Sequence, residues 1–426
     1  MTAKWTNIVK SDLMRNFVKL FSANVIAQVI GLLVYPFLTR LYTPSDFGLY
    51  NLFLSIAGIL VVISTCEYQN AVPLPSDDKL AVGAMHVGML CLVAVTALQC
   101  CLLPFADPIA RLFGSPELGR YLWMMPVFVF LSGLWQLLNY WFTRQKRFGA
   151  VSAYQISQSL TGAGAKWLFG FLRVPAGLLY SSLIAPLVAL FSSLLTGGRD
   201  VLLKCLKIDA THMRAALSQF SMFPKYSLPK SLVNIVNCNI AVLIITPFFG
   251  LATSGAWGLA MTLGFSPLGL ILNSLYQVLF PRCAALVQEK KPFLKQYRRY
   301  LLIVTLVVAP SFVLLYLLMP WLVGWFLGAG WDDTALMIRY LLPSFAMMCL
   351  VMPWSFLPDV FLQQKYALAL EIVHLILRVA AIGVGVAAQS IQVLLIGYSL
   401  CGVLVSLIQM IWFWNMLRRY EAGLAD

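Results

Sequence analysis

The 426-residue chain is 61% hydrophobic and 11% charged, with a formal net charge of +14 and a mean hydropathy of +0.84. A soluble protein carries about 25% charged residues, so this composition excludes a soluble enzyme, a secreted disulfide scaffold and a disordered chain. The apolar runs are continuous and lack the alternation of outer-membrane strands, which excludes a β-barrel. The sequence therefore predicts an all-α integral membrane protein.

Twelve apolar runs are long enough to span a membrane, since a spanning helix needs about 20 residues. A polar, basic stretch divides them into two sets of six. This predicts an N-terminal six-helix lobe over 1–196, a cytoplasmic linker over 197–218 and a C-terminal six-helix lobe over 219–426. In chain order the runs are 20–39, 47–70, 80–104, 119–141, 149–171, 174–195, 226–249, 256–280, 299–319, 335–357, 367–388 and 391–414.

The two sets resemble each other. An offset of 210 residues pairs Asn24 with Asn234 and Gly48 with Gly258. Because six is an even number, the two halves of a duplicated six-helix unit have the same topology and are related by an axis along the membrane normal. Two such halves enclose a central cavity, and this arrangement is typical of transporters that work by alternating access.

The basic residues predict the orientation of the spans. With the N-terminus inside, the cytoplasmic segments carry 23 Lys and Arg residues and the opposite side carries five. Lys and Arg accumulate in cytoplasmic loops, so both termini are expected in the cytoplasm. The same rule accounts for the positive net charge, and no nucleic-acid partner is expected.

Enzymatic and metal-binding patterns are missing from the sequence. It contains no HExxH, GxSxG or GxxxxGK[ST] motif, and its nine cysteines include no CxxC pair. Its outward loops are short for a membrane glycan polymerase or ligase. The sequence therefore predicts a protein that is not an enzyme and uses no cofactor or metal, with a coupling ion left open.

Three polar residues in the eleventh run, Glu371, His374 and Arg378, are spaced to share one helix face. Lys166 lies in the fifth run, which is the counterpart of the eleventh. A charge at the bilayer centre costs about 2.5–3.5 kcal/mol, so we interpret Lys166 and Arg378 as the cations of a substrate cavity. The alternative is structural: an ion pair between Glu371 and Arg378, with Lys166 extending its ammonium to the membrane surface.

Amide side chains line the first run of each half, and they are the remaining candidates for substrate contact. They serve equally well for hydrogen bonding between helices. Glu67 and His86 lie near predicted cytoplasmic ends, where we expect solvated structural roles. The amides are Asn24, Gln28, Asn234 and Asn237.

The segment from Ser22 to Pro75 contains Thr39-Arg-Leu-Tyr-Thr-Pro-Ser-Asp-Phe-Gly48, followed by Glu67 and Ala71-Val-Pro-Leu-Pro75. It resembles the N-terminal signature of bacterial polysaccharide biosynthesis proteins of the O-antigen flippase (Wzx) type. The resemblance implies the multidrug/oligosaccharidyl-lipid/polysaccharide (MOP) exporter superfamily and a fold like that of the multidrug exporters (MATE). Arg40 is implied as a cation at the outer mouth.

Members of this flippase family move undecaprenyl-pyrophosphate-linked sugar repeats to the outer leaflet of the cytoplasmic membrane, for surface polysaccharides such as lipopolysaccharide. The implied partners are the lipid-linked oligosaccharide, membrane lipids, and glycan polymerase and chain-length proteins. The alternative function is a cation-coupled multidrug exporter of the same superfamily. That function would call for acidic cavity groups, whereas the predicted cavity is cationic.

Overall fold

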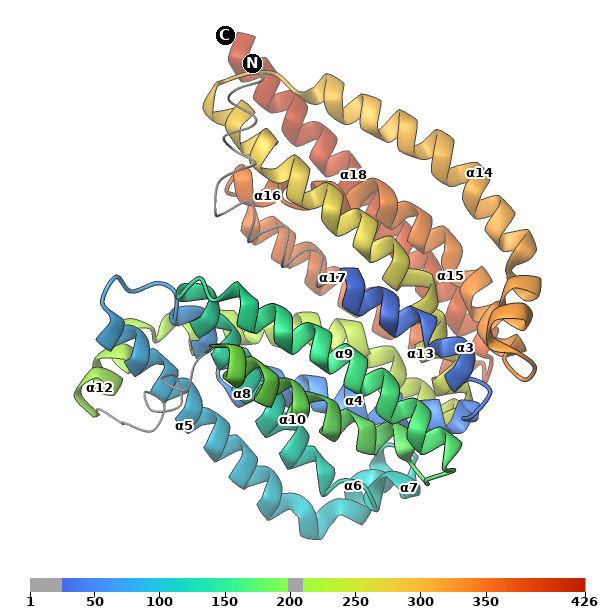
Figure 1. Cartoon of the computed structure of the whole chain (residues 1–426). Helices are drawn as coiled ribbons and strands as arrows, with labels where there is room; N and C mark the ends of the chain where they lie inside the picture. The colour runs from blue at the N-terminus through green and yellow to red at the C-terminus, as the bar shows by residue number, and fades with distance from the viewer. Residues whose placement is uncertain (1–24, 198–209, 426) are drawn as a thin grey trace. The chain divides into compact units, whose positions relative to one another are not determined.

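The computed structural model describes residues 25–197 and 210–425. These residues form helices joined by short turns and contain no strand (Figure 1). The chain divides into two compact units, Met1–Gly255 and Ala256–Asp426. These units are defined by contacts within the structure. The predicted lobes over 1–196 and 219–426 are defined by the sequence repeat and stay a prediction.

The first unit is built from helices that pack against neighbours in sequence and against helices farther along the chain. α9 (Phe148–Phe171) and α10 (Gly177–Gly197) lie side by side, and α8 (Met124–Arg144) packs against α4 (Pro44–Ser64) and α5 (Asp78–Leu102). Its other elements are Val25–Leu38, which ends in α3 (Tyr35–Leu38), then η1 (Tyr68–Ala71), η2 (Leu103–Phe105), α6 (Ala106–Leu112), α7 (Pro116–Gly119), α12 (Ala210–Gln219), the π-helical turn η3 (Phe223–Ser227) and the beginning of α13 (Leu228–Gln288).

The Thr39–Gly48 motif has a local structural reason. The Thr43 hydroxyl accepts a hydrogen bond from the Asp46 amide at 3.3 Å, and the Asp46 carboxylate accepts one from the Thr43 amide at 2.8 Å. This reciprocal pair is a capping box, and Pro44 supplies the fixed φ that suits a first helical residue. The motif therefore fixes the start of α4 directly after the first helix.

Gly250 divides α13 into two helical segments. Its backbone has φ 88° and ψ 169°, a left-handed conformation that favours glycine and cannot continue a helix. The residues before it correspond to the predicted seventh span and those after it to the eighth. The two segments are therefore separate helices that follow one another without a loop.

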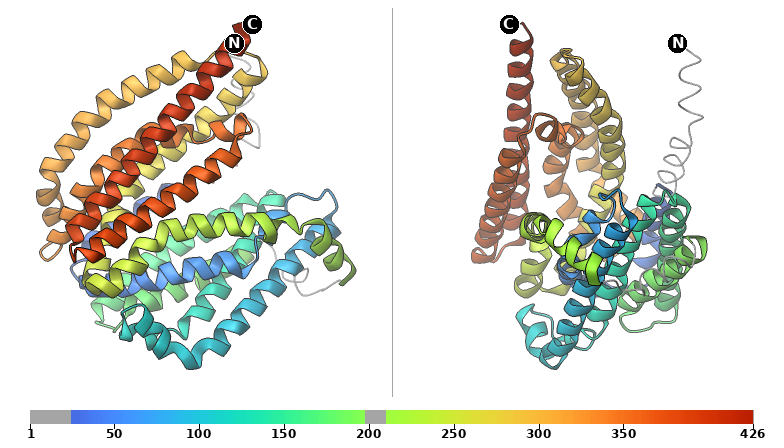
Figure 2. Two further views of the ribbon diagram at one scale, coloured as in Figure 1. Left: turned by 180° about the vertical axis from the view of Figure 1, so that it is seen from behind. Right: turned by 90° about the vertical axis from the view of Figure 1, so that its left-hand side faces the viewer.

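The second unit contains the rest of α13 and the C-terminal helices. α15 (Asp332–Val351) packs against α14 (Leu294–Leu327) and α18 (Ile391–Ala425), and α18 packs along α17 (Gln364–Ala387), as the left view of Figure 2 shows. Two short turns, η4 (Met352–Trp354) and α16 (Leu357–Val360), lie between α15 and α17. The core of this unit is aromatic, with Tyr297, Trp354, Phe356 and Phe413 buried together.

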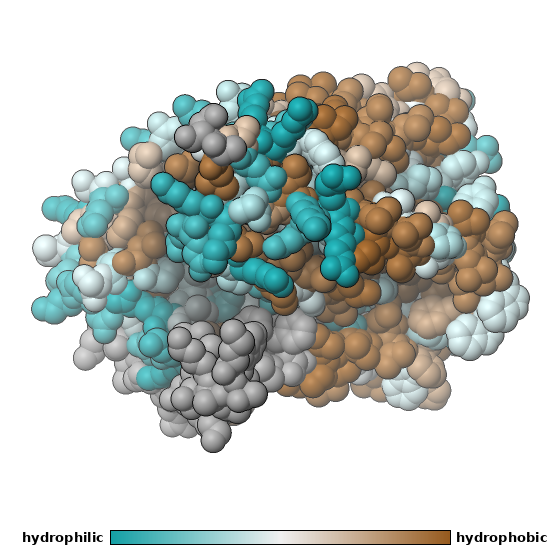
Figure 3. All heavy atoms as spheres, turned by 90° about the horizontal axis from the view of Figure 1, so that it is seen from above, coloured by the Kyte–Doolittle hydropathy of each residue, from teal (hydrophilic) through white to brown (hydrophobic). Residues whose placement is uncertain are grey.

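Within the described residues, every predicted span falls on a helix. Eight helices are long and apolar enough to cross a membrane, and one of them, Phe223–Gln288, contains both the seventh and the eighth predicted spans. Val25–Leu38, α8 and α9 supply the others. Figure 3 shows many apolar side chains as well as hydrophilic ones on the face it displays. The prediction of an all-α membrane protein with about twelve helices is confirmed.

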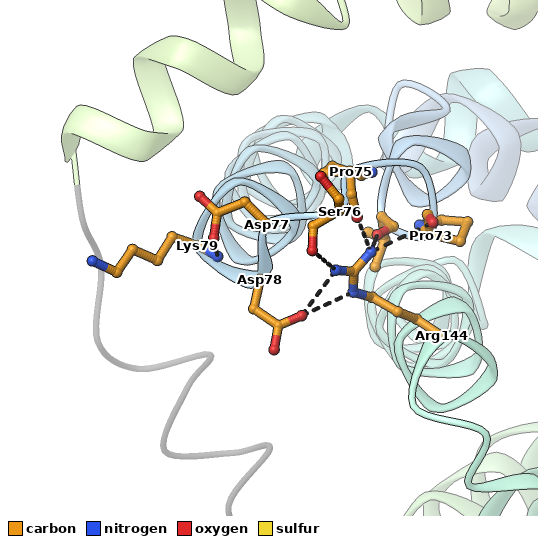
Figure 4. A network of polar contacts seen from close by, with 8 residues as sticks. Pro73, Pro75, Ser76, Asp77, Asp78, Lys79 and Arg144 are labelled. Atoms are coloured by element: carbon orange, nitrogen blue, oxygen red, sulfur yellow. Dashed lines mark hydrogen bonds and ion pairs between the residues drawn. The ribbon is translucent and has the colours of Figure 1, made fainter.

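The turn over 72–77 joins η1 to α5 and is held by Arg144, the last residue of α8 (Figure 4). The Arg144 guanidinium donates to the Asp78 carboxylate at 2.8 Å and to the main-chain carbonyl of Pro75. Further contacts to the carbonyls of Val72, Pro73 and Ser76 are longer, at 3.4 Å. Arg144 therefore fastens the end of α8 to the turn that begins α5.

Candidate functional site

Lys166 lies on α9 and faces tyrosine side chains of the first unit. Its ammonium is 4.8 Å from the centre of the Tyr50 ring on α4, with Tyr35 and Tyr42 also close to it. Among the described residues it forms no ion pair. An ammonium over an aromatic face gains about 0.5–2 kcal/mol, so the tyrosines stabilise the cation without neutralising its charge.

Tyr42 fixes the position of this lysine from the turn before α4. Its hydroxyl donates a hydrogen bond of 2.8 Å to the main-chain carbonyl of Lys166. Burial, assisted by the Asp46 carboxylate, raises the pKa of Tyr42 to about 12. The phenol is therefore neutral at physiological pH and keeps the proton that it donates to α9.

Arg378 occupies the corresponding helix of the second unit, α17. Its guanidinium carbon is 4.6 Å from the centre of the Tyr398 ring on α18. Tyr398 in turn meets the Trp257 ring edge to face at 5.0 Å, and both rings are buried. Stacking uses the face of the guanidinium, while its donors lie in the guanidinium plane.

His374 and Glu371 precede Arg378 by one and two turns. His374 is half-buried, and its Nε2 has no hydrogen-bond partner among the described residues. Glu371 is exposed, and the Tyr398 ring is one contact of the Arg378 guanidinium. The structure therefore brings Arg378 to an aromatic pair, and the Glu371–Arg378 ion pair stays an untested alternative.

The remaining predicted site residues are spread over the first unit. Arg40 is exposed and donates to the Pro36 carbonyl at 2.6 Å, Gln28 is half-buried, Asn234 is exposed and Asn237 is buried. Asn24 lies outside the described residues. Their assignment to a substrate site stays a prediction.

The prediction of a solvated role for Glu67 and His86 is wrong. Both are buried, with exposed fractions of 6% and 4%. The Glu67 carboxylate accepts hydrogen bonds from the amides of Gln69 and Asn70, and its backbone has a left-handed φ of 63°. The tight turn after α4 places the Glu67 side chain inside the unit. A hydropathy pattern locates the end of a span, but it does not predict which way the chain turns there.

The aromatic partners of the two cations are the residues that the sequence reasoning missed. Tyr50 is on the helix after the first span, whereas Tyr398 is on the last helix. Tyr35, Tyr42 and Phe47, which lie near Lys166 or near one another, fall in or beside the Thr39–Gly48 motif, so the motif contained a signal. Among the described residues no cluster of His, Cys, Asp or Glu could hold a metal ion.

The sequence profile of the polysaccharide biosynthesis protein family matches residues 37–336, well over half of the chain. The chain belongs to this family. It is 21% identical over 257 residues to the succinoglycan biosynthesis transport protein ExoT of Rhizobium meliloti (strain 1021). The match covers 60% of this chain, and the chain spans about half the length of that relative.

Solved transporters share the fold of this polysaccharide biosynthesis protein. It matches an inward-facing MATE-family multidrug transporter of the MOP superfamily with a TM-score of 0.72, over 95% of this chain and 99% of the other. It matches the lipid II flippase MurJ in an inward closed conformation with a TM-score of 0.73, over 95% and 90%. Both are 14% identical, so they show the fold alone. The predicted membership of the polysaccharide biosynthesis protein family is confirmed by the match over residues 37–336.

Proposed function

We propose that this polysaccharide biosynthesis protein is a flippase that moves undecaprenyl-pyrophosphate-linked oligosaccharide units outward across the bacterial cytoplasmic membrane by alternating access. Family membership, a relative named as a succinoglycan transport protein, and the fold shared with a lipid II flippase support this proposal. In this proposal both termini are cytoplasmic, and the protein transports its substrate without changing it chemically.

The observation that carries the proposal is the pair of tyrosine-backed cations, Lys166 and Arg378. A pyrophosphate leaving water needs Lys or Arg partners, and hydrogen bonds to such charged groups are worth about 1.5–3 kcal/mol each. Because Lys166 forms no ion pair among the described residues, its positive charge remains available to an anion. Tyr35 and Tyr50, which are half-buried beside Lys166, offer aromatic faces to sugars.

The membrane potential supplies a driving force for an anionic cargo. Each negative charge that moves outward across an inside-negative membrane gains about 2.3 kcal/mol per 100 mV. A pyrophosphate diester carries two such charges, which suffices for export without ATP. The exported unit then passes to glycan polymerase and chain-length proteins.

The test uses cells that depend on this chain for surface polysaccharide. Lys166→Gln and Arg378→Gln should abolish export, so that lipid-linked units accumulate while the amount of protein in the membrane stays unchanged. Lys166→Arg and Arg378→Lys should keep partial export because they keep the charge. Export by the Gln variants at the wild-type rate would refute the role of these cations.

Arg339 provides a matched control for Arg378. Its guanidinium also stacks on a tyrosine, at 4.2 Å from the centre of the Tyr316 ring, but it lies on α15 and outside the predicted site. Arg339→Gln removes the same charge and the same kind of contact. It should leave export nearly intact, whereas an equal loss in both variants would show a general need for stacked arginines.

A double variant, Glu371→Gln/Arg378→Gln, separates substrate contact from a structural ion pair. If the two residues only neutralise each other, removing both charges should restore both protein abundance and export. If Arg378 holds the substrate, the double variant keeps normal abundance and still lacks export. Increased sensitivity of a deletion strain to cationic dyes, with normal surface polysaccharide, would favour multidrug export instead.

A further inference from the structure

A pocket of about 210 Å³ lies within the first unit, between α4, α5, α6 and α8. Its walls are almost wholly apolar. The exception is Gln99 on α5. The lining residues are Ile56, Leu60, Gln99, Leu102, Leu103, Ala106, Ile109, Leu122, Met125 and Pro126.

An unpaired polar side chain, Gln99, distinguishes this pocket from an ordinary packing defect. The side chain is 8% exposed, and neither its amide nitrogen nor its amide oxygen has a hydrogen-bond partner among the described residues. Leaving a buried polar group unpaired costs about 1–3 kcal/mol. A ligand that fills the apolar space and reaches the amide would recover that cost.

The position of Gln99 along α5 indicates its depth in the membrane. Asp78, at the polar beginning of α5, is 21 residues away, and 21 residues of helix rise about 32 Å. The hydrocarbon core of a bilayer is about 30 Å thick. Gln99 is therefore level with the opposite edge of the core, and the exposed Asp107 and Arg111 of α6 follow shortly after it.

The surroundings of the pocket are suited to lipid. Leu98, Leu102 and Phe105, next to Gln99 in the chain, are 60%, 45% and 58% exposed, which in a membrane places them against acyl chains. An engineered apolar cavity of about 150 Å³ stays dry and binds benzene. A pocket of about 210 Å³ has room for a segment of hydrocarbon chain.

We propose that this pocket is a binding site for a diacyl phospholipid, which inserts an acyl segment between α4, α5 and α8 while its ester carbonyl accepts a hydrogen bond from the Gln99 amide. Ester carbonyls lie at the boundary of the hydrocarbon core, which is the level of Gln99. A polyprenyl chain would fill the same walls but has no carbonyl there. This site is independent of the proposed transport function and of Lys166 and Arg378.

The experiment measures the binding of one phospholipid to the delipidated, purified full chain by native mass spectrometry. The probes are diester phosphatidylglycerol, its diether analogue with the same chain lengths, and polyprenyl phosphate. Wild type should bind the diester about three- to tenfold more tightly than the diether, the size expected for one hydrogen bond. Equal binding of diester and diether, or preferred binding of polyprenyl phosphate, would overturn the proposal.

Three variants complete the test. Gln99→Leu keeps the side-chain size and should reduce diester binding to the diether level. Ala106→Phe fills the pocket and should weaken both lipids, whereas Leu98→Phe, which points outward, should change neither. If Ala106→Phe does not fold, the comparison of wild type with Gln99→Leu decides the question. Unchanged lipid binding in Gln99→Leu would overturn the proposal, because the lipid ester would then form no hydrogen bond with the Gln99 amide.

Discussion

Arg144 at the end of α8 offers a sharp test of how the first unit is held together. Arg144→Ala removes the side chain that joins α8 to the turn before α5 (Figure 4). The Arg144 side chain is 13% exposed, whereas the Asp78 side chain that it contacts is 71% exposed. The two partners of Arg144 therefore make very different contributions to stability.

The expected magnitude follows from the two short contacts. An exposed ion pair is worth about 0.2–1 kcal/mol, and this is the contribution of Asp78. A hydrogen bond from a charged donor to the half-shielded Pro75 carbonyl is worth about 1.5–3 kcal/mol. The contacts at 3.4 Å exceed the usual range and add little. We expect Arg144→Ala to lower the free energy of unfolding by about 2–4 kcal/mol and Asp78→Asn by at most about 1 kcal/mol.

Thermal unfolding of the purified chain in detergent measures this difference. For a unit of this size, 1 kcal/mol corresponds to about 2–4 °C in Tm, so Arg144→Ala should lower Tm several times more than Asp78→Asn. Lys79→Ala is the control, because Lys79 is exposed and carries the same charge at the start of α5. Equal shifts for Arg144→Ala and Asp78→Asn would refute the reasoning, because the ion pair would then carry the whole effect.

Three further predictions test other parts of the structure. A Cβ at Gly48 would lie 1.9 Å from the Leu251 carbonyl oxygen, so Gly48→Ala should lower the free energy of unfolding by at least about 1–3 kcal/mol. Gly58→Ala on the same helix is the control: the atom nearest to its Cβ is 3.7 Å away, so this change should leave Tm unchanged or raise it slightly. Burial raises the pKa of Tyr42 to about 12 from an ordinary value of 10, so the neutral phenol stabilises the fold fully below pH 10, and this stabilisation is lost between about pH 10 and 12. The Tm of Tyr42→Phe should therefore fall less steeply with pH over that interval than the Tm of the wild type. Cysteine reporters at the exposed positions Lys79 and Lys290, in a cysteine-free chain, should be shielded from impermeant thiol reagents in intact cells, and labelling of both would reverse the proposed orientation.

The helices were predictable because hydropathy acts locally. A run of about 20 apolar residues has one stable form in a bilayer, so the boundaries of α9 and α17 fall within a few residues of the predicted ones. The junction at Gly250 was less predictable. The predicted seventh and eighth runs leave a gap from 250 to 255, and within it a single left-handed glycine, Gly250, joins the two helical segments without a loop.

The partners of charged residues depend on tertiary contacts, and the sequence did not reveal them. Arg144 and Arg147 count as cytoplasmic charges in a prediction of topology, yet Arg144 holds the turn at Pro75 and Arg147 donates to the Gly197 carbonyl at the end of α10. Glu67 lies at the end of an apolar run but is buried, and its carboxylate accepts hydrogen bonds from the Gln69 and Asn70 side chains. Charge and position along a span identify such residues without identifying what they contact.

The tyrosine contacts of Lys166 and Arg378 suggest how a cation can be kept inside a membrane protein for an anionic substrate. A carboxylate partner would lower the cost of burial, but it would cancel the charge and compete with a phosphate for the same donors. A tyrosine ring gives a smaller stabilisation, about 0.5–2 kcal/mol, and leaves the full positive charge. The ring occupies the face of a guanidinium, whereas phosphate oxygens approach in its plane. A cation that serves only structure gains more from a carboxylate, so the tyrosines around Lys166, which forms no ion pair among the described residues, fit the proposed substrate role of this lysine.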